Sequence, residues 1–165
     1  MAELTNLESK LAEVLGLAEA AKGATETVKG MLDKDERDLA NTLVRMHDEA
    51  VETADRCTDV AGGFEGKKTA IIEAARETKQ EATEMMKTYL DGEDDALDGF
   101  EFLTMAEAGE VGHWAIVRKL NERANVSVVS ELVAWALPVQ EEHLKLVLNG
   151  ALELAGREDP DGIAE

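Results

Sequence analysis

Apolar residues recur every three or four positions along almost the whole chain, which is the spacing of one face of an α-helix. These stripes predict five helices, over residues 4–21, 34–61, 67–90, 95–123 and 127–155. Two short apolar runs, Val126–Val129 and Leu132–Leu137, are candidate strands, but both merge into the longer helical period. The pattern therefore predicts an all-α protein.

Glycine, proline and capping residues indicate where these helices should end or bend. Gly23 is expected to stop the first helix, and Pro138 is expected to kink the last one. Asn125 and Ser127 are suited to cap the start of that last helix. Short connections favour antiparallel neighbours. We therefore expect a bundle of four long helices, with the helix over residues 67–90 covering it on a long crossover.

Length and composition place the chain in one domain. Its 165 residues fit a single bundle over residues 1–156, followed by a flexible polar tail over residues 157–165. Only 4% of the residues are aromatic, so the core must consist mainly of aliphatic side chains and methionine. Cys57 is the single cysteine, which excludes an internal disulfide and a cysteine-based metal site.

The charge of the chain restricts its partners. Asp and Glu number 36 against 17 Lys and Arg, giving a formal net charge of −19. This charge repels phosphate backbones and anionic lipids, so we expect neither nucleic acid nor a membrane as partner. It attracts metal cations, and it also suits a high-salt habitat. With no signal peptide and no apolar stretch of about 18 residues, a cytoplasmic location is expected. A homodimer is consistent with apolar faces that one bundle leaves uncovered.

Two glutamates interrupt the apolar face of the segment 95–123. Glu107 and Glu110 lie on the stripe that the large apolar side chains form, and His113 follows Glu110 at the i, i+3 spacing that lets two side chains reach one ion. Small residues leave space around this position: Ala106, Gly109 and Gly112. Buried carboxylates are costly unless paired or metal-bound. Glu107, Glu110 and His113 are therefore candidate metal ligands, unless the glutamates lie at the edge of the stripe and reach water.

The segment 127–155 repeats this anomaly. Glu142 and His143 lie side by side on its apolar surface, although a lone histidine there is more often a hydrogen-bonded core residue. Antiparallel packing of the last two helices would bring both residues to the level of Glu107 and Glu110. Such a cluster has two consistent states, metal-bound and ionised, or metal-free with at least one carboxylate protonated.

The first two helices offer weaker candidates. Glu8 falls on the apolar stripe of the first helix and is the candidate ligand there. In the second helix His47, Glu49 and Glu52 lie at or near the edge of the apolar face, and the pattern does not choose among them.

The two motifs together resemble the ferritin-like superfamily of carboxylate-bridged metal four-helix bundles. They are Glu107-Ala-Gly-Glu110-Val-Gly-His113-Trp114 and Gln140-Glu141-Glu142-His143-Leu144. The extra crossover helix makes the chain most similar to YciE-type stress proteins. The resemblance implies a protein that binds iron or manganese, with zinc as another option, and a role related to oxidative stress or iron. The alternative is a non-enzymatic bundle that acts as an interaction or assembly module with a vacant site.

The superfamily pattern takes one glutamate from each of two helices and a Glu-x-x-His pair from each of two others. Glu110 and His113 match one such pair, and the resemblance implies Glu8 for the first helix. Gln140 stands where the pair ending at His143 would need a glutamate. A complete two-metal centre therefore departs from the pattern at this residue.

Overall fold

The chain folds into five helices, as the computed structural model shows for residues 2–163. No strand occurs within these residues. The helices are α1 (Asn6–Lys29), α2 (Arg37–Gly62), α3 (Lys68–Tyr89), α4 (Ala96–Ala124) and α5 (Ser127–Ala155). The prediction of an all-α protein is confirmed.

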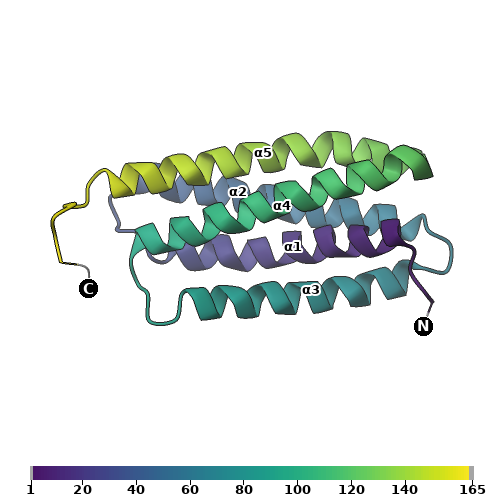
Figure 1. The fold of residues 1–165 in the computed structure, drawn as a ribbon, viewed down its shortest axis with the longest axis horizontal. Coiled ribbons are helices and arrows are strands. Elements are labelled where there is room, and N and C mark those ends of the chain that lie inside the picture. Colours follow the sequence, from purple (N-terminus) through teal and green to yellow (C-terminus); the bar gives the residue numbers. More distant parts are fainter. Residues whose placement is uncertain (1, 164–165) are drawn as a thin grey trace.

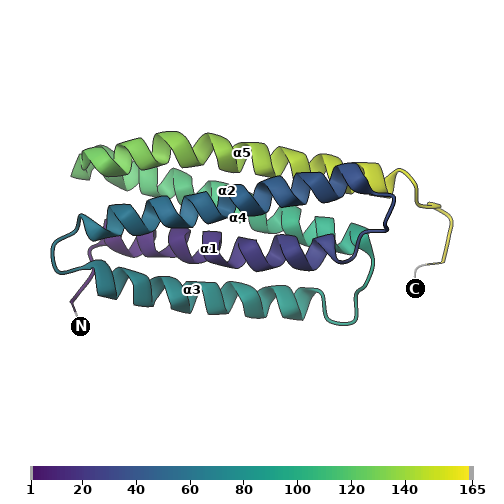
Figure 2. The same cartoon turned by 180° about the vertical axis from the view of Figure 1, so that it is seen from behind.

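Four of the helices surround a common interior, and α3 lies outside them (Figure 1). α1 packs along α2, α4 packs along α5, and the two pairs meet where α1 contacts α4 and α2 contacts α5. Consecutive helices run in opposite directions, and α3 lies against α1 on the side away from α5, as the view from behind also shows (Figure 2). α3 therefore carries the chain back along the bundle from the end of α2 to the start of α4.

α1 extends beyond the end that the sequence predicts. It starts at a capping box, in which the Thr5 hydroxyl accepts from the Glu8 backbone N–H at 3.3 Å and the Glu8 carboxylate accepts from the Thr5 N–H at 2.7 Å. It then continues through Gly23 to Lys29, so the predicted stop at Gly23 is wrong. A glycine inside a helix costs only about 1 kcal/mol relative to alanine, and burial of later residues such as Val28 outweighs that cost.

The turn between α4 and α5 also differs from the prediction. Asn125 adopts the left-handed conformation, with φ of 53°, and ends α4, while Ser127 is the first residue of α5. Neither residue caps α5. The side chain of Asn121 holds the turn instead, since its carbonyl oxygen accepts from the Val126 N–H at 3.0 Å. α5 then continues without interruption through Pro138.

The buried apolar side chains form two clusters, one in each half of the bundle. One cluster includes Leu11, Cys57 and Trp114, and the other includes Met46 and Phe100. At the level between them, polar side chains from α2, α4 and α5 occupy the interior. The bundle therefore has a polar layer between two apolar cores.

α3 has its buried residues in its first half. Its buried residues are Ala70, Ile71 and Ala75. There α1 and α3 approach so closely that a Cβ atom on Gly16 would lie 2.4 Å from the backbone oxygen of Ala75. The second half of α3, from Thr78 onward, buries no residue.

Two further features concern the termini and the surface. Arg157, the first residue of the predicted tail, pairs with Glu36 and with Glu153. Residues 164–165 of that tail lie outside the described part of the chain. Within residues 2–163, none of the helices combines the length and the hydropathy that crossing a membrane requires.

Candidate functional site

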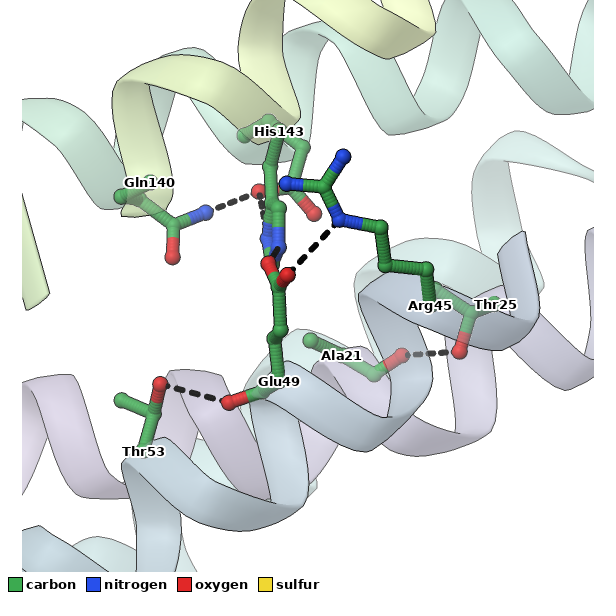
Figure 3. A network of polar contacts seen from close by, with 8 residues as sticks. Ala21, Thr25, Arg45, Glu49, Thr53, Gln140 and His143 are labelled. Carbon is green, nitrogen blue, oxygen red and sulfur yellow. Dashed lines mark hydrogen bonds and ion pairs between the residues drawn. The ribbon is translucent and has the colours of Figure 1, made fainter. Parts of the chain in front are cut away.

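The polar layer brings together side chains that are far apart in the sequence. Glu49 comes from α2, Glu107 from α4, and Gln140 and His143 from α5. Figure 3 shows Glu49 and His143 pointing toward each other across the space between their helices, with the Arg45 guanidinium beside Glu49. Glu107, Gln140 and His143 are each at most 4% exposed, so the layer lies in the interior and opens outward at Glu49.

His143 lies between two carboxylates. Its Nε2 atom is 2.6 Å from an Oε atom of Glu49, and its Nδ1 atom is 3.7 Å from an Oε atom of Glu107. Ionised carboxylates only accept hydrogen bonds, so this geometry favours a ring with protons on both nitrogens. Burial by itself lowers the pKa of His143, but the hydrogen bonds and charges of Glu107 and Glu49 outweigh it and raise the pKa.

Glu49 is held in its ionised form. Burial by itself raises its pKa, but the hydrogen bonds from Arg45 and His143, with their charges, lower the pKa below its ordinary value. Arg45 Nε donates to one carboxylate oxygen at 2.8 Å, while His143 binds the other. The Thr53 hydroxyl stays outside this network, because it donates to the Glu49 backbone oxygen in its own helix. Arg45 and His143 therefore balance the charges of Glu49 and Glu107.

Gln140 supplies the donor on the other side of Glu107. Its side-chain amide donates to the Glu107 oxygen atom that also faces His143. An amide can donate without carrying charge, whereas a glutamate at this position would place a second negative charge beside Glu107. The departure from the superfamily pattern at Gln140 thus gives a buried carboxylate a neutral partner.

Glu110 faces a different part of the interior. It is 5% exposed and lines a pocket between α1, α3 and α4. Burial, and then the neighbouring charge of Glu107, raise the pKa of Glu110 well above its ordinary range. Burial therefore favours the neutral form of Glu110 in the metal-free protein. Burial also raises the pKa of the Cys57 thiol, which lies in the apolar core.

The structure brings some of the expected ligands together and separates others. The burial of Glu107 and Glu110 and the approach of His143 to Glu107 agree with the expectation. Glu8 is buried, but its contacts are with Thr5 in the capping box and with Lys67 at 3.9 Å, at the end of the bundle where α1 begins. The expected place of Glu8 in the cluster is therefore not what the structure shows.

His113 and Glu142 lie away from the polar layer. The His113 Nδ1–H donates to the Gly109 carbonyl oxygen at 2.8 Å, and its Nε2 atom is 3.5 Å from Glu13 of α1. The i, i+3 spacing from Glu110 does not join the two side chains, because His113 turns back onto its own helix. Glu142 is half-buried, and its charge acts on Arg45 at the rim.

Among the three candidates in the second helix, the structure selects Glu49. His47 pairs with Glu26 and Asp48, and Glu52 pairs with Arg56 in its own helix. The choice depends on which residue faces α5, and the stripe pattern alone does not give the rotation of the helix to that accuracy. Arg45 was not expected from the sequence. The only sequence pattern that points to Arg45 is its i, i+4 spacing to Glu49, and such spacing is common on exposed helix faces.

The donor types in the polar layer suit iron or manganese, which take carboxylate and imidazole ligands. Within residues 2–163, however, no group of three or more His, Cys, Asp or Glu side chains is arranged to hold a metal ion. Glu49 and His143 are joined to each other by a hydrogen bond, so coordination would have to replace that bond. The side chains are of the types that bind such metals, but in the structure they are hydrogen-bonded to one another.

No family model, no curated protein and no solved structure matches this chain.

Proposed function

We propose that the polar layer binds one divalent iron or manganese ion through Glu49, Glu107 and His143, as part of a ferritin-like metal-binding bundle. The observation that carries the proposal is that three different helices place two carboxylates on either side of one imidazole ring, between the two apolar cores. A fold of this size does not need such a layer, since apolar side chains of similar volume are often at least as stabilising. Buried titratable groups with shifted pKa values are typical of functional sites.

The charges of the layer support one ion rather than two. In the metal-free protein the positive charge between Glu49 and Glu107 is carried by the protonated His143 ring. A divalent cation would take the place of that charge, and His143 would release its proton to coordinate. A second ion would need a further imidazole or carboxylate, but His113 and Glu8 make their contacts elsewhere. A redox-active ion would supply oxygen or peroxide chemistry here.

The second candidate is a non-enzymatic bundle, acting as an interaction or assembly module. One observation favours it: the network is already complete without a metal, because the cations Arg45 and His143 balance Glu49 and Glu107. In this case the layer would fix the register of the helices rather than bind an ion.

Metal content separates the two candidates. Protein purified without chelator, and then titrated with Fe²⁺ under anaerobic conditions or with Mn²⁺, should retain about one ion per chain after gel filtration. The variant E107L should lose this ion, because it removes the carboxylate that faces both His143 and Gln140. Proton release on binding, measured in weakly buffered solution, should accompany the uptake.

The matched control is E52L, which removes a carboxylate of α2 that is bound to Arg56 on the exposed face. It should bind the same amount of metal as the parent. If the parent retains no ion, or if E107L retains as much metal as E52L, the metal proposal is wrong and the non-enzymatic bundle is the better interpretation.

A further inference from the structure

A pocket of about 250 Å³ lies between α1, α3 and α4, beside the polar layer. Small residues from all three helices form much of its wall, among them Ala20 and Ala21 of α1, Ala82 of α3, and Ala106 and Gly109 of α4. A Cβ atom on Gly109 would meet nothing within 4 Å, so the space is not filled by neighbouring side chains. The small residues near Glu110 therefore leave room on this side of α4.

The way α3 packs explains why the pocket is there. α1 and α3 are in close contact at Gly16 and Ala75, and the pocket lies further along both helices, between Leu17–Ala24 and Ala82–Met86. This part of α3 buries no residue, so it covers the space without filling it. A bound molecule would add to the partial apolar contacts that Met86 and Tyr89 already make in the second half of α3.

Glu110 is the carboxyl group that lines this mostly apolar space, whose lining also includes Thr83 and His113. Glu110 is nine-tenths or more buried and lines the pocket, and no hydrogen bond contributes to the environment of its carboxyl group. In residues 2–163 every fully enclosed side-chain nitrogen or oxygen atom has a hydrogen-bond partner. The Glu110 oxygens therefore retain contact with the pocket. A ligand with a hydrogen-bond donor would give this carboxyl the partner that the chain does not supply.

We propose that this pocket binds a small, largely apolar amine, whose nitrogen donates to the carboxyl group of Glu110. Within the part of the chain that the structure describes, no Lys or Arg lines the pocket, and the formal net charge of the chain is −19. These charges attract a cationic ligand and repel a carboxylate. Met85, Met86 and Met105 line the apolar part together with Phe102. Methionine adapts its shape and contacts aromatic rings favourably, which suits an arylalkyl amine.

The volume limits the size of the ligand. A cavity of about 150 Å³ accommodates benzene, so a pocket of this volume has room for roughly ten non-hydrogen atoms. 2-Phenylethylamine has this size and the right polarity, and it serves as the probe. Its uncharged analogue 2-phenylethanol and its anionic analogue 3-phenylpropanoate have similar apolar bodies.

The experiment measures binding of these three compounds to the full chain by calorimetry, with hydrogen exchange on the amide groups of residues 78–89. We expect 2-phenylethylamine to bind at one site per chain and to slow exchange in the second half of α3. 2-Phenylethanol should bind about tenfold more weakly, and 3-phenylpropanoate should not bind measurably. Equal binding of the amine and the acid would overturn the proposal.

Two variants test the place of binding. A82L fills the pocket from α3 and should weaken binding of the amine by about tenfold or more, while E81L adds the same side chain at the adjacent exposed position and should leave binding unchanged. E110Q should remove the preference for the amine over the alcohol and keep binding of the alcohol. If A82L binds the amine as tightly as E81L does, the pocket is not the site.

The inference does not depend on the proposed metal. Fe²⁺ or Mn²⁺ uptake by A82L should equal that of the parent, because Ala82 lies on α3 and outside the polar layer. Failure of amine binding with normal metal uptake would reject the pocket alone, and the reverse result would reject the metal site alone.

Discussion

At the residue scale, the charged groups in the polar layer depend on the neighbours that pair with them. Glu49 needs both Arg45 and His143, and His143 needs the carboxylates on either side of it. Glu110 has no such partner, and burial raises its pKa and favours its neutral form. Removing one member of the layer should therefore affect stability through the charge that its neighbour is left with, and not only through lost contacts.

Replacing His143 by Gln should reduce the stability of the metal-free protein and flatten its dependence on pH. The folded pKa of His143 is raised above its ordinary value of 6.5, so its contribution is fully present below that pH and is lost as the pH rises through the folded pKa. Urea unfolding with chelator should show that H143Q is less stable by about 1–3 kcal/mol at pH near 6, because Glu49 and Glu107 lose their shared cation.

The difference between H143Q and the parent should shrink as the pH rises above 6.5 and through the raised pKa of His143. H47Q is the matched control, because His47 binds exposed carboxylates outside the layer. A pH dependence that H47Q flattens and H143Q leaves intact would contradict this interpretation of the layer.

Replacing Glu110 by Gln should stabilise the metal-free protein at neutral and alkaline pH. The folded pKa of Glu110 is raised well above 4.5, so above that pH the unfolded chain gains from ionisation while the folded protein does not. E110Q removes this difference, so its advantage over the parent should grow as the pH rises above about 4.5. Thermal unfolding at several pH values measures it, and a variant that is less stable than the parent at every pH would rule out a protonated, unpaired Glu110.

At the element scale, α1 contains one glycine in close contact with α3 and one glycine beside open space. At Gly16 the helix touches α3 so closely that no side chain fits, while a Cβ atom on Gly23 would meet nothing within 4 Å. Both glycines lie inside the same helix, so they share the same loss of helix propensity and differ in packing only. This makes them a matched pair for testing how α3 is held.

The variant G16A should destabilise the protein by about 1–3 kcal/mol, because the new methyl group forces α3 away from α1. G23A should instead stabilise it by about 0.5–1 kcal/mol, because alanine favours the helix and meets no obstacle. Chemical denaturation of the two variants checks both signs. If G16A is as stable as G23A, the close contact between α1 and α3 is not as the structure describes it.

At the scale of the whole molecule, the formal net charge of −19 opposes compaction. Many of the ion pairs on the surface are local, between residues three or four apart in one helix, as in Lys10–Glu13, Arg56–Glu52 and Lys119–Glu122. Such pairs contribute little, so they do not offset the repulsion between helices. The stability of the bundle should therefore respond strongly to ionic strength.

Raising NaCl from about 0.05 M to about 1 M should raise the melting temperature, because screening acts on the repulsion between acidic surfaces. Sucrose at matched osmolality serves as the control for effects that do not depend on charge, and it should give a smaller rise. A melting temperature that falls or stays constant with NaCl would show that the acidic surface is not what limits stability.

The sequence by itself determined the five helices, since stripes repeating every three or four residues depend only on local geometry. It also indicated that Glu107, Glu110 and His143 point inward, because each interrupts an apolar stripe. It could not place Glu8 or His113, whose contacts are made with the capping box and with the helix's own backbone.

Only the tertiary structure decided which partners meet. The choice of Glu49 over its neighbours depends on how α2 is rotated toward α5, and a helix stripe is too broad to give that angle. The pocket forms because α3 lies against α1 and covers this side of α4. Glu110 lines the pocket, whereas Glu107 faces α5 and belongs to the polar layer. Helix formation is a property of each segment, whereas the polar layer and the pocket exist only where segments distant in the sequence pack together.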